Sequence, residues 1–433
     1  MKNNDFKLKK NIIVQGKQIP QGIVRISGAK NSALKLLAAS LLTEEDIELY
    51  NFPAAILDVK IHLEMLNTLG KYITIDNSYV KIGGKTDQIK TDLEWNNRSI
   101  RSTLLVLGAL TTRFGKGRVP LPGGCNLGDR KYDLHVMILE RMGAKVWEEE
   151  NYLCADVKER LAGTDIHLPI RSTGATENGI IAGTLARGTT TIWNPHIRPE
   201  ILDLISMLRK MGAKIKVFGQ KCIEITGVER LQGARHTVVP DNVEAITWAI
   251  ASVITNGDIE IENFPFRHLE IPLVFLRESG MKAYRGENSL IVRGGQPFPV
   301  EISTGPYPGI NSDMQPLFAV YGACSEGESK IVDLRFPGRY AYAHELGKMG
   351  MKFTEDGDLL KISGGNPLHG ATVKALDLRA GIALLLAGLT AEGTTVIENA
   401  WQIERGYENL GGKLAQLGVH DFEITENIVN ALH

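Results

Sequence analysis

The sequence contains little cysteine. Its 433 residues include four, Cys125, Cys154, Cys222 and Cys324, and none of them form a Cys-x-x-Cys pair. This spacing excludes a disulfide framework and the common cysteine-rich zinc sites. Each cysteine is therefore either a small buried side chain or a reactive thiol. The stretch Pro-Leu-Pro-Gly-Gly-Cys that ends at Cys125 is compatible with both interpretations.

The sequence also lacks a long hydrophobic run and an excess of either charge. Its longest apolar stretch, at 381–389, is about half the length of a membrane-spanning helix. The N-terminal residues are charged and contain no apolar segment of the kind found in signal peptides. We therefore expect a cytoplasmic protein without a membrane partner. The 49 Lys and Arg residues balance the 50 Asp and Glu residues, which argues against nucleic acid as a partner.

Two nucleotide-binding motifs are missing as well. No Gly-x-Gly-x-x-Gly opens a helix after a strand, and no P-loop is present, so a doubly wound sheet is not expected. Instead, an amphipathic helix that ends in a hydrophobic residue and glycine recurs about every 70 residues, a longer period than that of solenoid repeats. The six glycines suit left-handed helix ends and are Gly70, Gly143, Gly212, Gly280, Gly350 and Gly418.

A second pattern alternates with the first. Each of its six copies has a nearly all-apolar helix, a turn and an alternating strand, as in "VEAITWAIASVITNGDIEIEN". A helix that is apolar on every side is buried, and the alternating strand is half-buried. The repeats therefore predict an α/β protein of two domains with three units each. We expect the buried helices inside, the sheets outside, and a ligand cleft between the domains.

Several charged residues are not explained by the repeat. Taken singly, Lys30 could extend to the surface, Asp313 and Asp377 could be helix N-caps, and an arginine in a turn could be solvated. Together, six cations flank apolar helices or glycine-containing turns, and if they converge they predict a pocket for a small, multiply anionic ligand. These cations are Lys30, Arg101, Arg130, Arg339, Arg379 and Arg405.

The motifs that contain these residues resemble one family. "SGAKNSALKLLAASLL", "LPGGCNLGDRKYDLH", "TGATENGIIAGTLARGTTTIWN", "YPGINSDMQ", "DLRAGIALLLAGLTAEGTTV" and "ERGYE" are similar to segments of the UDP-N-acetylglucosamine enolpyruvyl transferases (1-carboxyvinyltransferases). The similarity extends from about Lys9 to about Val419. It implies two inside-out α/β barrel domains, each of three βαβαββ repeats. One domain would comprise residues 30–239 and carry the cysteine loop, and the other would comprise 1–29 and 240–433, with the active site in the cleft between them.

The resemblance also implies a reaction. The enolpyruvyl group of phosphoenolpyruvate would be transferred to the 3-hydroxyl of UDP-N-acetylglucosamine with release of phosphate, the first committed step of peptidoglycan precursor synthesis. Cys125 would donate a proton to the enol carbon, and Asp313 would accept the proton of the acceptor hydroxyl. Lysine and arginine would supply the positive charge, so no metal or other cofactor is expected, and no obligate protein partner is implied.

The resemblance assigns the remaining binding residues by motif. Phosphoenolpyruvate would be held by Lys30, Arg130 and Arg405, with the positive cluster completed by Arg101, Arg339 and Arg379, next to Asp377. The acceptor would be placed by Asn31, and the uridine and phosphate side would be lined by Asp133, Leu134, His135, Ser172, Thr173 and Gly174. Arg101, Arg130 and Asp313 would also face the acceptor.

Several acceptor-side positions differ from the family pattern. Lys131 and Tyr132 follow Arg130 where proline and an aliphatic residue are usual, and Arg335 stands where an aliphatic residue is usual. Other departures are Gly338, Asn242 and Arg198. Because of these departures, a second acceptor is also compatible with the sequence. This acceptor is the 3′-hydroxyl of UMP, as in nucleoside antibiotic biosynthesis. Cations such as Lys131, Arg171 or Arg335 would suit its terminal phosphate.

Other functional classes are less consistent with the sequence. The shikimate 3-phosphate branch of the enolpyruvyl transferases lacks the Pro-Gly-Gly-Cys segment. An RNA 3′-terminal phosphate cyclase, which shares the repeat unit, would need a catalytic histidine motif that we do not find. A catalytically inactive nucleotide-binding scaffold would not need Cys125, Asp313 and the arginine set.

The reactive-thiol interpretation of Cys125 can be tested with fosfomycin. We expect the drug to alkylate this thiol when nucleotide is present, because a thiol amid positive charge has a lowered pKa and is more nucleophilic. Intact-mass spectrometry should show one adduct on the wild type and on Cys154→Ser, and none on Cys125→Ser. An unmodified wild type at saturating drug and nucleotide would refute this interpretation.

Overall fold

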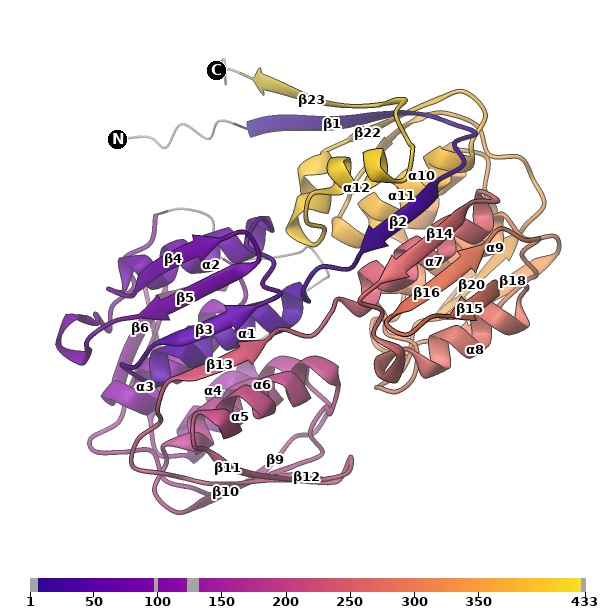
Figure 1. Cartoon of the computed structure of the whole chain (residues 1–433). Helices are drawn as coiled ribbons and strands as arrows, with labels where there is room; N and C mark the ends of the chain where they lie inside the picture. The colour runs from indigo at the N-terminus through magenta and orange to yellow at the C-terminus, as the bar shows by residue number, and fades with distance from the viewer. Residues whose placement is uncertain (1–6, 97–99, 123–131, 430–433) are drawn as a thin grey trace. The chain divides into compact units, whose positions relative to one another are not determined.

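The computed structural model describes residues 7–96, 100–122 and 132–429 (Figure 1). The chain divides into two compact units. We call Ser27–Val239 the central unit, and Met1–Ile26 together with Pro240–His433 the terminal unit. The terminal unit is thus built from both ends of the chain.

The central unit has its most hydrophobic helices inside. Three helices are buried along nearly their whole length: α1 (Lys30–Ala39), α3 (Thr103–Phe114) and α5 (Thr173–Thr184). Helix α3 packs against both α1 and α5. Three further helices bury mainly one face: α2 (Leu57–Thr68), α4 (Asp133–Arg141) and α6 (Pro199–Lys210).

Sheets cover these helices (Figure 1). The described residues of the central unit form three sheets, with orders β13-β3-β5-β4, β6-β8-β7 and β11-β12-β10-β9. The strands are β3 (Ile47–Tyr50), β4 (Tyr72–Asp76), β5 (Tyr79–Gly83), β6 (Lys116–Pro120), β7 (Lys145–Glu149), β8 (Tyr152–Asp156), β9 (Asp165–His167), β10 (Thr189–Trp193), β11 (Lys214–Phe218), β12 (Cys222–Thr226) and β13 (Ala234–Thr237).

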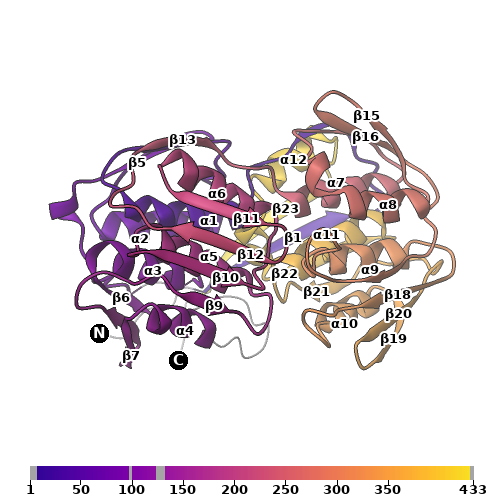
Figure 2. The same cartoon turned by 90° about the horizontal axis from the view of Figure 1, so that it is seen from below.

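The terminal unit repeats this plan. Its buried helices are α7 (Asn242–Ile254), α9 (Gln315–Ala323) and α11 (Leu378–Thr390), which pack against one another in all three pairs. The other helices are α8 (Glu270–Glu278), α10 (Ala341–Lys348) and α12 (Leu410–Gln416). Figure 2 shows α9 and α10 beside the sheet that contains β18, β19 and β20.

Three sheets also form in the described part of the terminal unit, with orders β21-β22-β1-β23, β15-β16-β14-β2 and β17-β18-β20-β19. The strands are β1 (Lys7–Gln15), β2 (Gln21–Arg25), β14 (Asp258–Glu262), β15 (Lys282–Arg285), β16 (Ser289–Arg293), β17 (Glu301–Ser303), β18 (Glu328–Val332), β19 (Lys352–Asp356), β20 (Leu359–Ser363), β21 (Thr372–Lys374), β22 (Thr394–Glu398) and β23 (Phe422–Val429). Short 3₁₀ turns lie at Ser40–Leu42, Thr86–Gln88, Phe266–His268 and Ala400–Arg405.

The N-terminal strand completes the last repeat. In the sheet β11-β12-β10-β9, strand β10 pairs parallel with β9 and antiparallel with β12, the second strand of a hairpin. In the sheet β21-β22-β1-β23, the position of β12 is taken by β1, which pairs antiparallel with β22 and β23. The last repeat therefore needs a strand from the other end of the chain. This arrangement confirms the α/β class with helices inside and sheets outside.

The helix-ending glycines behave as the sequence predicts. All six have a positive φ, between 75° and 101°, which is the left-handed region that glycine adopts without steric cost. The residue after the glycine is buried and apolar in five repeats, at Ala144, Ala213, Met281, Met351 and Val419. In the first repeat this residue is Lys71, and it is only 1% exposed.

Lys71 is a charged residue at an apolar position. Its Nζ donates a hydrogen bond to the carbonyl of Thr43 at 2.8 Å. Burial, with a contribution from the neighbouring Arg113 charge, lowers the pKa of Lys71 to about 7. The Lys71 ammonium group therefore binds its proton less tightly in the folded protein than in the unfolded chain. As a result, between pH 7 and the ordinary lysine pKa, the contribution of Lys71 to the free energy of unfolding rises with pH.

Replacing Lys71 with methionine should stabilise the protein. We expect Lys71→Met to raise the unfolding free energy at pH 7 by roughly 1–3 kcal/mol, because a buried charge is removed and Arg113 still donates to the Thr43 carbonyl at 2.7 Å. Urea unfolding at several pH values measures the effect, and the gain should shrink towards pH 10. The control Lys60→Met removes an exposed lysine of α2. A less stable Lys71→Met variant would contradict the prediction.

Candidate active site

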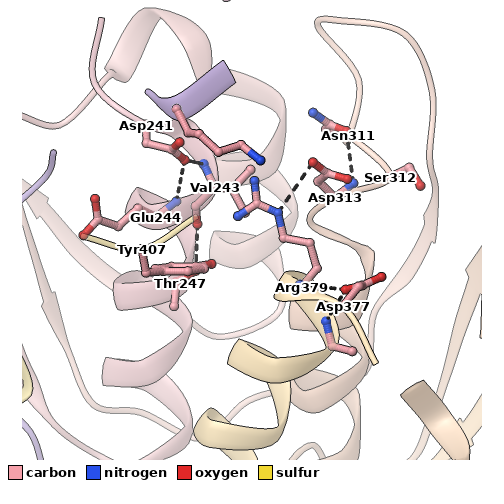
Figure 3. A network of polar contacts seen from close by, with 12 residues as sticks. Asp241, Val243, Glu244, Thr247, Asn311, Ser312, Asp313, Asp377, Arg379 and Tyr407 are labelled. Carbon is pink, nitrogen blue, oxygen red and sulfur yellow. Dashed lines mark hydrogen bonds and ion pairs between the residues drawn. The ribbon is translucent and has the colours of Figure 1, made fainter. Parts of the chain in front are cut away.

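The terminal unit brings four of the predicted site residues together, and Figure 3 shows three of them, Asp313, Asp377 and Arg379. Arg339 Nη1 lies 3.2 Å from Asp313 Oδ1, and Arg339 Nη2 lies 3.4 Å from Asp377 Oδ2. Arg379 Nε lies 3.5 Å from Asp313 Oδ2. We call Asp313, Arg339, Asp377 and Arg379 the aspartate–arginine cluster. Its two positive and two negative charges balance.

The buried arginines keep their charge because carboxylates face them. The side chain of Arg339 is 10% exposed and that of Arg379 is 2% exposed. Burial alone would lower the pKa of each guanidinium. For Arg339, Asp313 and Asp377 outweigh burial and raise the pKa, and for Arg379 Asp313 makes the largest opposing contribution. The cluster therefore holds two permanent cations whose charges the two carboxylates balance.

The two aspartates occupy different positions at their helices. Asp377 is the N-cap of α11, and its Oδ1 accepts hydrogen bonds from the backbone N–H groups of Arg379 and Ala380 at 2.7 and 2.8 Å. The N-cap interpretation is thus correct for Asp377, which also contacts Arg339 through its other oxygen. The N-cap of α9 is Met314 rather than Asp313. Asp313 lies in the turn before that cap, where its backbone N–H donates to Asn311 Oδ1 at 3.0 Å.

A buried carboxylate that no sequence pattern indicates holds two of these segments. Asp333 is fully buried and follows β18. It accepts hydrogen bonds from Ser312 Oγ at 2.6 Å and Gln315 Nε2 at 3.1 Å, on either side of Asp313. It also accepts from the backbone N–H groups of Arg335 and Phe336, at 2.9 Å each. Asp333 thereby fixes the turn of Asp313 beside the segment that leads to Arg339.

Two other predicted residues of the terminal unit have different surroundings. Arg405 ends the 3₁₀ turn Ala400–Arg405, is 3% exposed, and donates through Nη1 to Gln402 Oε1 at 3.0 Å. A solvated arginine in a turn is therefore the wrong interpretation for Arg405. Arg335 is exposed, and its Cζ lies 5.0 Å from the centre of the Phe336 ring.

In the central unit, Lys30 is the first residue of α1. It is buried, and its Nζ lies 3.4 Å from Asp58 Oδ2, so it does not extend to the surface. Asp58 is the second residue of α2 and was not singled out in the sequence. Further along α1, Lys35 forms a buried ion pair with Glu177 at 2.9 Å and donates a hydrogen bond to the carbonyl of Asn31. This second pair connects the start of α1 to α5.

The predicted nucleotide segments of the central unit meet at one glycine. A Cβ at Gly174 would come within 2.9 Å of His135 Nε2, so the His135 ring occupies the space that a side chain at position 174 would need. Ser172 caps α5 by accepting a hydrogen bond from the N–H of Ala175 at 3.4 Å. Next to it, Thr173 Oγ1 lies 2.8 Å from His196 Nδ1. The structure thus brings the segments 133–135 and 172–174 together.

Electrostatics at this junction leave one histidine neutral. Burial, and then the charge of Arg101, lowers the pKa of His135 to about 3. Burial also lowers the pKa of Arg101, although Asp133 opposes the shift. His135 is therefore uncharged at neutral pH, and the charge of Arg101 acts on both Asp133 and His135.

Three predicted residues, Cys125, Arg130 and Lys131, lie outside the described residues. Tyr132 follows them, and its hydroxyl donates a hydrogen bond to Glu148 Oε1, which raises the pKa of Tyr132 to about 12.

Among the described side chains, no group of three or more His, Cys, Asp or Glu could hold a metal ion. No described helix has the length and hydrophobicity that crossing a bilayer requires.

Comparison with known proteins defines the class. Residues 14–414 match the family model of EPSP synthase (3-phosphoshikimate 1-carboxyvinyltransferase). The chain belongs to this family of carboxyvinyltransferases, also called enolpyruvyl transferases.

The relatives that resemble this chain include proteins named UDP-N-acetylglucosamine 1-carboxyvinyltransferase. That of Finegoldia magna is 40% identical over 92% of this chain and 95% of its own length, and that of Actinobacillus succinogenes is 41% identical over 94% and 97%. The resemblance found in the sequence is confirmed.

Solved structures agree on the fold. The enolpyruvyl transferase NikO from Streptomyces tendae matches with a TM-score of 0.87 at 24% identity, over 97% of this chain and all of its own. EPSP synthase from Acinetobacter baumannii matches with a TM-score of 0.74 at 18% identity, over 96% of this chain and all of its own. At these identities the two structures establish the fold alone.

The two contacts of Asp377 can be separated by substitution. Asp377→Asn keeps an oxygen that can cap α11, whereas Asp377→Ala removes both the cap and the partner of Arg339. We expect Asp377→Ala to lower the unfolding free energy by roughly 1–2 kcal/mol and Asp377→Asn by less than half of that, because asparagine is as good an N-cap as aspartate. Urea unfolding measures both. Equal losses would mean that the charge of Asp377, not its cap, dominates.

Proposed function

We propose that this chain transfers the enolpyruvyl group of phosphoenolpyruvate to the 3-hydroxyl of UDP-N-acetylglucosamine and releases phosphate. The observation that carries the proposal is the 40% identity, over more than nine-tenths of the chain, to proteins named for this reaction. The reaction would begin the synthesis of peptidoglycan precursors. We further propose a cytoplasmic location and no obligate protein partner.

The reaction needs an acid, a base and cations. Protonation of C3 of phosphoenolpyruvate makes C2 electrophilic, and the acceptor hydroxyl adds to C2 as it loses its proton. The resulting tetrahedral ketal then loses a proton from C3 and expels phosphate, which restores the double bond on the acceptor. Positioned acids and bases and preorganised charges accelerate such steps. Lysine and arginine can supply the positive charge.

Asp313 is the proposed base. Both of its oxygens face guanidinium groups of Arg339 and Arg379, so they can accept the hydroxyl proton only when one oxygen turns towards the acceptor. The phosphate and carboxylate of phosphoenolpyruvate suit the same two arginines, because guanidinium forks match both groups. Substrate anions would thus compete for the arginines and leave Asp313 to the acceptor hydroxyl.

The remaining roles follow the motifs. We propose that Cys125 protonates C3, and that Lys30, Arg130 and Arg405 hold phosphoenolpyruvate with Arg101 nearby. The burial of Arg405 and the ion pair of Lys30 with Asp58 support roles for these cations inside a site rather than at the surface. The proposed acceptor residues are Asn31, Lys131, Tyr132, Asp133, Leu134, His135, Ser172, Thr173, Gly174 and Arg335. We propose that the site lies in the cleft between the domains 30–239 and 1–29 with 240–433.

A phosphate-release assay tests the reaction. With phosphoenolpyruvate, we expect turnover with UDP-N-acetylglucosamine and little with UMP, because the relatives at about 40% identity are named for the former. Product mass should increase by one enolpyruvyl group. Turnover with UMP alone would overturn the assignment of the acceptor, and no phosphate release with either would overturn the transferase function.

Asp313→Asn tests the base. We expect kcat to fall by roughly 10²–10⁴-fold, because removal of a general base costs about this much. The control Asp356→Asn neutralises an exposed aspartate at the end of β19 and should keep wild-type turnover. Near-normal turnover of Asp313→Asn would show that another group accepts the proton.

A further inference from the structure

A buried aspartate joins three elements of the central unit. Asp203 of α6 is 4% exposed, and α6 packs against both α1 and β13 (Figure 1). Asp203 Oδ2 accepts a hydrogen bond from Ser32 Oγ of α1, and Asp203 Oδ1 lies 2.7 Å from His236 Nε2 of β13. Ser32 and His236 are buried as well. The proposed reaction uses none of these three side chains.

The chemistry of the partners sets the direction of each hydrogen bond at Asp203. Lys210 Nζ lies 3.2 Å from His236 Nδ1, and an ammonium group can only donate. Nδ1 of His236 is therefore the acceptor, so the ring proton is on Nε2 and is donated to Asp203 Oδ1. A carboxylate can only accept, so Ser32 Oγ is the donor to Asp203 Oδ2. Both oxygens of Asp203 are thus engaged, and its carboxylate cannot turn without losing a hydrogen bond.

Asp203 holds the chain on both sides of residues 30 and 31. Ser32 follows these residues and Ala29 precedes them. The N–H of Ala29 donates to the carbonyl of Val239 at 2.7 Å, and the N–H of Val239 lies 3.5 Å from Asp203 Oδ2. Ala29 is the N-cap of α1, and its methyl group cannot accept a hydrogen bond from the first turn. The start of α1 is therefore held through Asp203 and Val239 instead of through a capping side chain.

The two proposed site residues at the start of α1 depend on this network to different degrees. The side chain of Lys30 has a buried partner of its own, because its Nζ lies 3.4 Å from Asp58 Oδ2. The backbone around Asn31 is held by Lys35, which donates to the Asn31 carbonyl, and by the contacts of Asp203. Loss of the contact between Ser32 and Asp203 should therefore displace Asn31 more than the ammonium group of Lys30.

We propose that Asp203, oriented by His236, is a positioning residue that sets Asn31 for the acceptor UDP-N-acetylglucosamine. This inference rests on the proposed function, which gives Asn31 its role towards the acceptor. It assigns no direct contact with substrate to Asp203, His236 or Ser32. Their effect should therefore appear in the binding of the nucleotide sugar and much less in that of phosphoenolpyruvate.

Ser32→Ala tests the proposal, because it removes the contact of α1 with Asp203 and leaves the pair of Asp203 and His236 in place. We expect KM for UDP-N-acetylglucosamine to rise about tenfold, the size of one lost hydrogen bond to a charged group. KM for phosphoenolpyruvate should stay within about twofold of the wild type. The matched control is Ser40→Ala, which removes a buried hydroxyl at the other end of α1, bonded to the carbonyl of Leu37 at 2.6 Å. It should keep both wild-type values.

Two substitutions of His236 test its part in orienting Asp203. His236→Leu removes the donor to Asp203 Oδ1, and we expect KM for UDP-N-acetylglucosamine to rise roughly threefold, less than in Ser32→Ala, because the bond from Ser32 remains. His236→Gln keeps an N–H group that can donate to the same oxygen and should stay near the wild-type value. Equal KM values for the two variants would contradict the orienting role of His236.

Binding of UDP-N-acetylglucosamine alone separates this inference from the proposed function. Isothermal titration calorimetry without phosphoenolpyruvate should give a Kd about tenfold higher for Ser32→Ala than for the wild type and Ser40→Ala. A wild type that binds the nucleotide sugar but releases no phosphate would overturn the proposed function, and the titration would still decide the role of Asp203. The inference is wrong if Ser32→Ala binds the nucleotide sugar as Ser40→Ala does, if the wild type does not bind it, or if both KM values rise together.

Discussion

Two arginines that are almost completely buried remain charged in the terminal unit because two aspartates face them. Without Asp313 and Asp377, burial would make the cations of Arg339 and Arg379 costly. With them, the four charges cancel. Under the proposed function, each arginine would exchange a protein carboxylate for an anionic group of phosphoenolpyruvate. Because Asp313 is also the proposed base, binding of the anion would then release the base through the same contacts.

The cluster depends on how three helices begin. Asp313 precedes α9, Arg339 precedes α10, and Asp377 and Arg379 form the start of α11. Their positions are set by groups that are themselves buried and hydrogen-bonded. Asp333 joins the turns that carry Asp313 and Arg339, and the Asp377 cap fixes the first turn of α11. A functional group held in this way loses little entropy when it binds its ligand.

The sequence predicts much of the fold, because the repeat is written in local signals. Helix-ending glycines, all-apolar helices and alternating strands each have a physical cause that acts within a few residues. The position of β1 in the last sheet has no such signal, since it depends on pairing between the two ends of the chain. For the proposed site, the cations and Asp313 stand out in the sequence because they interrupt the repeat.

Two buried carboxylates beside these residues could not be found in this way. Asp58 pairs with Lys30, and Asp333 holds the turn of Asp313, but both lie in stretches where an acidic residue is unremarkable. Their contacts join separate segments of the chain, such as the 2.6 Å bond from Ser312 Oγ to Asp333. Sequence patterns report local preferences and leave such tertiary contacts undetermined.

The buried cations differ in the groups that face them. Lys30, Arg339 and Arg379 each face a carboxylate, whereas Lys71 donates to a backbone carbonyl. The carbonyl offers only a dipole, and the pKa of Lys71 falls to about 7, so this lysine loses part of its charge at neutral pH. A cation that must meet a substrate anion has to stay charged before the anion arrives. In this fold the carboxylates keep the arginines charged, as the proposed binding of phosphoenolpyruvate requires.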